Sequence, residues 1–373
     1  MSTAIFWTSV LLVGYTYAGY FALIALLARM RGSTPQLANA TPAITVVIAA
    51  YNEAQQIAAR LRDVFAQDYP SDRIAVVVAS DGSNDGTEHA AAIDARVRVL
   101  ALPENRGKAA GLNAALEHVN SDIVVFADAR QRFAPGALRR LVAPFADAQV
   151  GAVTGELVLL ESGATQPARI GLYWRMEKFL REGEARLGWL HGVSGAVYAL
   201  RRELFVPLPP GTILDDMWTP MHVAAARRRV WMARDAIAYD TISKDDAEEF
   251  RRKLRTLAGN WQLLGHMPQL LNPLRNPLWF AWFSHKFLRL IAPWALIAAW
   301  ISAALIPGMF YRAAFVLQTL GYLGAAFAIA APRSAARVPL LPVAGTFVML
   351  NVAALLALPA CVALDPRGLW KKH

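Results

Sequence analysis

Four stretches of the chain are apolar and contain no charged side chain: residues 1–28, 290–311, 313–331 and 338–364. Each is long enough to cross a bilayer as a helix, because a crossing takes about 20 apolar residues. All the acidic residues except Asp365 lie between Arg29 and Arg289. The pattern therefore predicts a polar domain between one N-terminal anchor and a cluster of three membrane spans.

Short apolar runs alternate with helix-like stretches in the polar region. Strands are expected at residues 43–50, 74–79, 97–102 and 123–127, and helices near residues 55–67 and 107–119. This alternation indicates a parallel sheet with helices on both faces. We find no internal repeat and no low-complexity segment that would suggest another architecture.

Polar clusters directly follow three of the predicted strands, at residues 51–53, 80–83 and 128–130. Ligands of parallel sheets bind beyond the carboxyl ends of the strands, so the clusters should gather on one rim, beside Lys108. One interpretation is a pocket for a nucleotide and its metal. The other is that Asn, Asp, Ser and Gly only form turns and helix caps. Three clusters on one predicted rim favour the pocket.

Composition and charge narrow the function. The single cysteine, Cys361, excludes an internal disulfide and a cysteine-cluster zinc site. The net charge is +10, but residues 29–289 hold 32 basic and 27 acidic residues without a basic run, which argues against nucleic acid as a partner. An anionic lipid surface and an anionic donor explain the charge better.

Basic residues beside the apolar segments predict the orientation of the chain. No basic residue precedes the first segment, so we interpret it as a permanent anchor rather than a secretory signal. Arg29 and Arg31 follow it, which by the positive-inside rule places the polar domain in the cytoplasm. The basic tail departs from this alternation, unless the last segment, which Pro339, Pro342 and Pro359 interrupt, does not cross. The predicted organisation is an anchor at 1–29, a cytoplasmic domain at 41–247, interfacial amphipathic helices at 248–285, three spans at 286–365 and a basic tail at 366–373.

Six motifs together resemble the membrane-bound branch of family 2 of the inverting glycosyltransferases, which includes cellulose, chitin and hyaluronan synthases. They lie at residues 46–53 (VVIAAYNE), 80–87 (SDGSNDGT), 104–113 (ENRGKAAGLN), 126–130 (FADAR), 194–202 (SGAVYALRR) and 213–218 (ILDDMW). The resemblance implies an α/β fold of the nucleotide-sugar-binding glycosyltransferase A type, which is Rossmann-like and has one mixed, largely parallel sheet. It also implies transmembrane helices on both sides of this domain and an integral protein of the bacterial inner (cell) membrane.

The resemblance implies a role for each matching residue. Tyr51 and Glu53 would border the base and ribose of a UDP-sugar, Asp81 would hold the uracil ring, Lys108 would meet the diphosphate, and Asp128 would bind Mg²⁺ or Mn²⁺. Asp216, beside Asp215, would be the general base for the acceptor hydroxyl. The chemistry is consistent, because a cation stabilises the leaving diphosphate and a carboxylate accepts the hydroxyl proton. We expect one carboxylate of the pair to cap the following helix and the other, Asp216, to react.

Two departures from the family pattern bear on the activity. The metal motif reads Asp128-Ala129-Arg130, so its usual third residue, a carboxylate, is replaced by an arginine that could reach the diphosphate instead. Polymerising members carry a Q-x-x-R-W motif, whereas this chain keeps only its arginine, Arg255. We therefore expect transfer to a membrane-associated, lipid-linked or saccharide acceptor. A processive polysaccharide synthase and a non-catalytic protein that binds nucleotide-sugars are the alternatives.

Two amphipathic stretches are expected to lie at the membrane surface. One carries an apolar stripe of Phe250, Leu254, Leu257, Trp261 and Leu264, and the other covers residues 169–190. Trp261 and Arg255 of the first stretch are predicted to lie near the acceptor or the diphosphate. Trp218 is predicted to stack on an acceptor sugar. The loop that contains Gly195 forms either an acceptor site or only a tight turn, and His191 is as compatible with a structural role as with a catalytic one.

Overall fold

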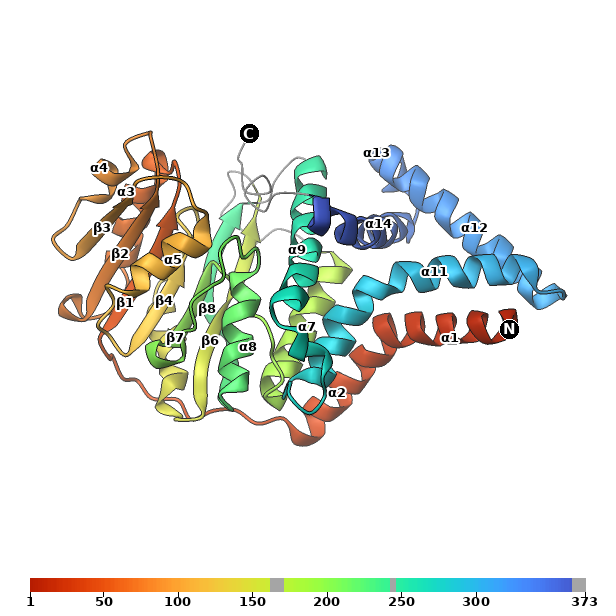
Figure 1. Ribbon diagram of the computed structural model, residues 1–373, viewed down its shortest axis with the longest axis horizontal. Helices are drawn as coiled ribbons and strands as arrows, with labels where there is room; N and C mark the ends of the chain where they lie inside the picture. The colour runs from red at the N-terminus through yellow and green to blue at the C-terminus, as the bar shows by residue number, and fades with distance from the viewer. Residues whose placement is uncertain (162–170, 242–245, 364–373) are drawn as a thin grey trace. The chain divides into compact units, whose positions relative to one another are not determined.

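The computed structural model describes residues 1–161, 171–241 and 246–363. The described residues divide into two compact units. The sheet unit comprises residues 27–242 and 266–279, and the helical unit comprises residues 1–26, 243–265 and 280–364. Figure 1 shows the strands in the first and the long apolar helices in the second.

Within the described residues the sheet has eight strands in the order β3-β2-β1-β4-β7-β6-β8-β5. They are β1 (Ile44–Ala50), β2 (Ile74–Asp81), β3 (Val97–Leu102), β4 (Ile123–Ala127), β5 (Arg132–Phe133), β6 (Val150–Leu160), β7 (Val197–Arg201) and β8 (Arg229–Thr241). The half formed by β1 to β4 is parallel, as the apolar runs predict. Strand β7 joins β4 antiparallel, so the complete sheet is mixed.

Helices cover both faces of this sheet. The helices of the sheet unit are α3 (Ala54–Phe65), α4 (Thr87–Ala91), α5 (Lys108–Leu116), α6 (Ala137–Val142), α7 (Leu172–Leu187) and α8 (Asp215–Ala225). On one face, Val46 and Ile48 of β1 pack with Ile57 and Leu61 of α3. On the other face, α5 lies close enough for a Cβ at Gly111 to be 3.4 Å from the Cβ of Ala49. Both faces are buried because successive strand residues point in opposite directions.

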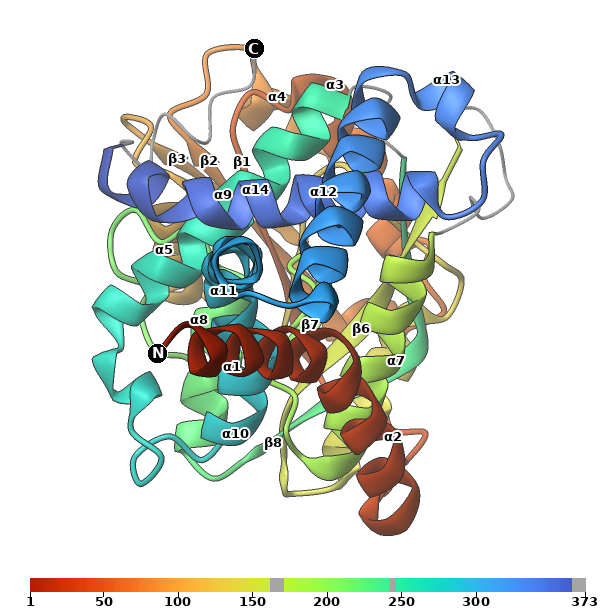
Figure 2. The same ribbon diagram turned by 90° about the vertical axis from the view of Figure 1, so that its right-hand side faces the viewer.

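The helical unit contains the four apolar helices that the sequence predicts. Candidate membrane spans in the described residues are Ser2–Arg31, Trp279–Leu305, Met309–Ala330 and Leu341–Ala363. The helices of these spans are α1 (Ser2–Gly14), α2 (Tyr20–Arg31), α10 (Trp279–Trp282), α11 (Leu288–Leu305), α12 (Met309–Ala330) and α14 (Leu341–Ala363). The short helix α13 (Pro332–Ala335) lies in the chain between α12 and α14. Helix α11 packs against α1, α12 and α14 (Figure 2).

Polar side chains connect the spans inside the helical unit. The Tyr15 hydroxyl lies 2.8 Å from Ser284 Oγ, and the Tyr17 hydroxyl donates to Asn351 Oδ1 at 3.0 Å. Tyr15 and Ser284 belong to π-helical turns, Tyr15–Gly19 and Phe283–Phe287, which continue into their helices without a break. Hydrogen bonds of this kind help to fix the register between helices where water is absent.

The spans begin and end differently from the charge-free stretches. The second span begins at Trp279, well before residue 290, so that Lys286 lies within a continuous helix. A long basic side chain allows this, because its methylene groups can pack among apolar residues while its charge reaches a polar neighbour. The last apolar segment forms one helix that contains Pro359, so the proline does not prevent a helix of spanning length. The basic tail at 366–373 lies outside the described residues.

Both predicted amphipathic stretches contain a helix. Helix α9 (Asp246–His266) carries the stripe from Phe250 to Leu264 and belongs to the helical unit. Helix α7 belongs to the sheet unit, and the part of its stretch before residue 171 lies outside the described residues. Residues between α9 and Trp279 form a short 3-10 turn, Pro268–Leu271, and no further helix.

Candidate active site

The carboxyl ends of β1, β2 and β4 form one rim of the sheet unit, as parallel pairing requires. Residues 51–53, Asp81 and Asp128 therefore lie on this rim, where the sequence predicts them. Strand β7 runs the other way, and its first residue, Val197, pairs with Ala127 at the end of β4. The residues that precede β7, including Gly195, consequently reach the same rim.

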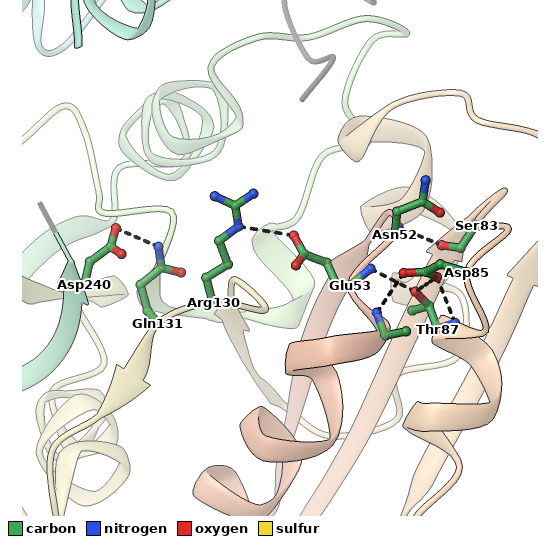
Figure 3. Close-up of polar contacts among 9 residues, drawn as sticks. Asn52, Glu53, Ser83, Asp85, Thr87, Arg130, Gln131 and Asp240 are labelled. Atoms are coloured by element: carbon green, nitrogen blue, oxygen red, sulfur yellow. Dashed lines mark hydrogen bonds and ion pairs between the residues drawn. The ribbon is translucent and has the colours of Figure 1, made fainter. Parts of the chain in front are cut away.

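The turn after β1 is held by side chains of the turn after β2 (Figure 3). The backbone N–H of Asn52, which adopts a left-handed φ of 52°, donates to Ser83 Oγ at 3.1 Å. The backbone N–H of Glu53 donates to Thr87 Oγ1 at 2.9 Å, and the N–H of Ala54 donates to Asp85 Oδ2 at 3.0 Å. These bonds fix the direction of the Tyr51–Glu53 segment at the start of α3.

The Glu53 carboxylate and the Arg130 guanidinium point toward one another in Figure 3. Arg130 Nε lies 3.4 Å from Glu53 Oε1; Glu53 is largely buried, and Arg130 is exposed. The next residue, Gln131, donates to Asp240 Oδ2 of β8 at 3.0 Å. The segment after β4 is thus connected to β1 on one side and to β8 on the other, and the guanidinium of Arg130 lies beside the predicted ribose site.

Asp81 is the last residue of β2 and is only 3% exposed. Its Oδ1 accepts the backbone N–H of Arg106 at 2.9 Å, and its Oδ2 accepts the backbone N–H of Gly107 at 2.7 Å. The carboxylate therefore holds the turn that leads into α5. Lys108 is the first residue of that helix.

Lys108 joins two carboxylates from different parts of the chain. Its Nζ lies 3.1 Å from Asp128 Oδ1, after β4, and 3.1 Å from Asp215 Oδ2, at the start of α8. Burial alone lowers the pKa of Lys108, but Asp128 and then Asp215 more than offset this effect, so its pKa is raised and the ammonium stays charged. Asp215 is buried, whereas Asp128 is 37% exposed and has a surface open to a ligand.

Gly195 faces the space between Lys108 and Asp216. A Cβ at this position would lie 3.5 Å from Lys108 Nζ and 3.9 Å from Asp216 Cβ. Two backbone bonds hold its loop: Val193 N–H donates to the Asp216 carbonyl at 2.9 Å, and Ser194 N–H donates to Thr154 Oγ1 at 2.8 Å. A Cβ at this position would therefore contact both of these side chains.

Neither aspartate occupies the N-cap position of α8, so the prediction that one of them does is wrong. The N-cap position is Leu214, which makes no side-chain capping bond. Asp215 and Asp216 both lie in the first turn, where exposed backbone N–H groups favour negative charge. Asp215 pairs with Lys108 instead, and this partner compensates for the burial of its carboxylate.

Tyr198 is a neighbour of this cluster that the sequence analysis did not single out. It lies on β7, is 1% exposed, and stacks on Phe126 of β4 with ring centroids 4.4 Å apart. Burial, and then the charge of Asp215, raise the pKa of Tyr198 well above its usual value. The hydroxyls of Tyr198 and Thr219 are both buried and make no hydrogen bond of good geometry within the described residues. The signal available in the sequence was its place in the SGAVYALRR motif, directly after the glycine loop.

Other predicted residues lie apart from this cluster. Trp218 is 7% exposed, donates from its indole N–H to the Val206 carbonyl at 3.2 Å, and packs on His222. In this structure the ring packs within the protein, and its stacking on an acceptor sugar stays a prediction. His191 is buried beside Glu184, 3.7 Å away. Arg255 and Trp261 lie on α9 in the helical unit, and their predicted contact with acceptor or diphosphate also stays a prediction.

The rim fits a divalent cation with a small set of protein ligands. Asp128 is 37% exposed, whereas Asp215 and Glu53 are each only 10% exposed. Mg²⁺ in nucleotide sites is commonly held by one or two carboxylates together with phosphates and water. Asp128 and a diphosphate would satisfy this requirement, although the Lys108 ammonium already neutralises part of the Asp128 charge.

Comparison with known proteins finds relatives of the sheet unit. Residues 45–206 match the family described as Glycosyl transferase family 2, and this range covers most of the rim described above. The fold resembles that of the mannosyltransferase PcManGT from Pyrobaculum calidifontis, solved in complex with GDP-Man and Mn²⁺. The TM-score is 0.72 and the identity 24%, with 97% of this chain and 99% of that chain covered.

Curated relatives match over part of their length. An N-acetylglucosaminyltransferase of Mesorhizobium japonicum is 28% identical over 233 residues, which is 57% of this chain and 55% of that protein. A beta-monoglucosyldiacylglycerol synthase of Trichormus variabilis is 30% identical over 154 residues, which is 39% of this chain and 33% of that protein. The chain spans about half the length of the first of these relatives and about a third of the second.

Proposed function

We propose that the protein is a membrane-bound glycosyltransferase with a nucleotide-sugar donor and a membrane-associated acceptor, because residues 45–206 match glycosyl transferase family 2. The observation that carries the proposal is the position of Lys108. Its ammonium lies 3.1 Å from Asp128 and 3.1 Å from Asp215, so the predicted donor and acceptor sides of the rim meet at one cation.

On the donor side, Tyr51 and Glu53 border the nucleoside of a UDP-sugar, and Asp81 holds the turn that leads to Lys108. Negative charge develops on the diphosphate when the sugar leaves. Lys108 and Arg130 supply fixed positive charge at this rim, and a preorganised charge stabilises such a leaving group without reorganisation. Mg²⁺ or Mn²⁺ at Asp128, when bound, would supply Lewis-acid stabilisation of the same oxygens.

On the acceptor side, Asp216 accepts the proton of the acceptor hydroxyl. The hydroxyl oxygen forms a bond to the anomeric carbon, the bond from that carbon to the diphosphate oxygen breaks, and the electron pair leaves with the nucleoside diphosphate. Asp215 is paired with Lys108, so the other carboxylate at the start of α8, Asp216, is the proposed base. Attack from the face opposite the leaving group inverts the anomeric centre.

The acceptor is proposed to be a lipid-linked or lipid-borne saccharide at the cytoplasmic face of a bacterial inner membrane. Four helices of spanning length support a membrane location. One curated relative is a synthase of beta-monoglucosyldiacylglycerol and others are N-acetylglucosaminyltransferases, so glucosyl and N-acetylglucosaminyl donors are the first to test.

The test is transfer of radiolabelled sugar by the purified full-length protein in vesicles of bacterial lipid. UDP-glucose, UDP-N-acetylglucosamine and GDP-mannose are supplied with Mg²⁺ or Mn²⁺, or with chelator. Label in the solvent-extractable lipid fraction supports the proposal, whereas label in high-molecular-weight polymer supports a processive synthase. No transfer from any donor would support the non-catalytic alternative.

The Asp216→Asn variant tests the general base within the same assay. We expect transfer to fall by about a thousandfold or more with little change in thermal stability, because general base catalysis contributes roughly 10²–10⁴-fold. Asp235→Asn, at an exposed position of β8, is the matched control and should transfer sugar at the wild-type rate. Unchanged transfer by Asp216→Asn would remove this residue from the mechanism.

A further inference from the structure

The buried carboxylate of Asp81 accepts hydrogen bonds from backbone groups. Both of its oxygens accept N–H groups from consecutive residues, Arg106 at 2.9 Å and Gly107 at 2.7 Å. Bonds from N–H donors to an ionised carboxylate are stronger than bonds between neutral groups. The residue after Asp81, Gly82, touches the same segment, because a Cβ there would be 2.5 Å from the Asn105 backbone nitrogen. The end of β2 therefore holds residues 104–107 in place through two sets of contacts, the hydrogen bonds of Asp81 and the close packing of Gly82.

These contacts between the end of β2 and residues 104–107 determine where α5 begins. Gly107 occupies the N-cap position with φ 89° and ψ 162°, a conformation that only glycine adopts readily, and it provides no side-chain cap. Lys108 is the first helical residue, so the direction of its side chain depends on how the turn before it is held. In the structure that side chain reaches both Asp128 and Asp215.

The same contacts also change how an anion can bind at the start of α5. The N–H groups before a helix usually form a binding site for phosphate. Here the two N–H groups that precede Lys108 are directed at Asp81, whose negative charge would repel a phosphate at that point. A diphosphate next to α5 would consequently be bound by the Lys108 ammonium and not by these backbone N–H groups.

We propose that Asp81 is a positioning residue that acts on the diphosphate of the donor through Lys108, in addition to any contact with the base. This inference rests on the proposed function, because it takes the diphosphate as the ligand of Lys108. It predicts that loss of the Asp81 carboxylate weakens binding of a diphosphate even when no nucleoside is attached.

Inorganic pyrophosphate is the probe, since it carries the two phosphates and no base or ribose. Its binding to the full-length protein in detergent, with Mg²⁺, is measured by isothermal titration calorimetry. We expect Asp81→Asn to weaken binding at least about tenfold, because the amide retains the size of the carboxylate but loses one acceptor and the charge. Lys108→Met should weaken it to a similar extent. Adding Asp81→Asn to Lys108→Met should then change the affinity less than about twofold, because the two residues act through one ammonium.

Glycine variants make the test independent of the folding of Asp81→Asn. A Cβ at Gly107 has open space around it, so Gly107→Ala alters only the backbone of the turn and should also weaken pyrophosphate binding. Gly136→Ala is the matched control, because Gly136 is the N-cap of α6 with φ 75° and lies outside the rim. It should bind pyrophosphate with wild-type affinity.

The outcomes separate this inference from the proposed function. Wild-type binding of pyrophosphate that Asp81→Asn and Gly107→Ala both leave unchanged would overturn the positioning role alone. Additive losses in the double variant would do the same, since they would mean that Asp81 contributes independently of Lys108. No binding by the wild-type protein would overturn the diphosphate role of Lys108, and this inference with it.

Discussion

Adding one methyl group at Gly195 is expected to separate activity from stability. The backbone of Gly195 does not lie in the left-handed region, and an alanine Cβ would meet its nearest neighbours, Lys108 Nζ and Asp216 Cβ, at 3.5 and 3.9 Å. These are ordinary van der Waals distances, so no neighbour has to move. Gly→Ala at a compatible position changes stability by only about 0.4–1 kcal/mol, in the stabilising direction, because it restricts the unfolded chain.

The effect on transfer should be much larger. The methyl group occupies the side of Lys108 Nζ that faces Asp216, where the proposed reaction takes place between the donor diphosphate and the acceptor hydroxyl. Displacement of a reacting group by about 1 Å lowers a rate by roughly a hundredfold. We therefore expect kcat/KM of Gly195→Ala to fall about a hundredfold while the unfolding temperature stays the same or rises slightly.

Initial rates of sugar transfer in lipid vesicles and thermal unfolding in detergent measure the two quantities. Gly171→Ala is the control, because Gly171 has an extended backbone with an ordinary φ of −63° and nothing within 4 Å of its added Cβ. It should show the same small stability change and full activity. If Gly195→Ala keeps kcat/KM within about threefold of wild type, the space between Lys108 and Asp216 is not where sugar and diphosphate bind.

Three further variants test other parts of the structure. Tyr198→Phe should lower kcat about tenfold, because the hydroxyl lies beside the ionic cluster, without lowering the unfolding temperature, because that hydroxyl makes no hydrogen bond of good geometry. Arg130→Asp places a second carboxylate two residues after Asp128 and should tighten Mn²⁺ binding in the presence of UDP on the order of tenfold, as seen by electron paramagnetic resonance; unchanged affinity would exclude this position from the metal site. Burial raises the pKa of Tyr69 from 10.0 to about 12, so its stabilising contribution is complete below pH 10 and disappears as the pH rises through 12. The stability difference between wild type and Tyr69→Phe should therefore narrow over that range in thermal unfolding, and a constant difference would contradict the burial argument.

The parallel half of the sheet and the membrane helices could be predicted because their signals are local. A buried parallel strand must be apolar on both faces, and β1, β2 and β4 are almost entirely apolar, apart from Thr45 in β1 and the last two residues of β2. A spanning helix must be apolar over its whole length, which makes it visible in the charge pattern. Topology then places Glu53, Asp81 and Asp128 on one rim, since each follows or ends a parallel strand.

The position of the second span shows the limit of that reasoning. The charge-free stretch begins at residue 290, whereas the helix begins at Trp279 and includes Lys286. Whether a lysine interrupts a span depends on what its long side chain can reach, and this is not recorded in the spacing of charges.

The sequence by itself determined which charged residues lie at the rim, because the residue types and the ends of the apolar strands can both be recognised from neighbouring positions in the chain. Only the tertiary structure decided that Lys108 pairs with Asp128 and Asp215. It also decided that Asp81 accepts hydrogen bonds from the backbone and that Tyr198 lies beside the cluster. These contacts join segments that are far apart in the chain. The antiparallel strand β7 and the starts of α5 and α8 bring these segments to the same rim. Burial makes such pairing compulsory, since a charge removed from water needs a partner, but which partner it finds depends on how the elements pack.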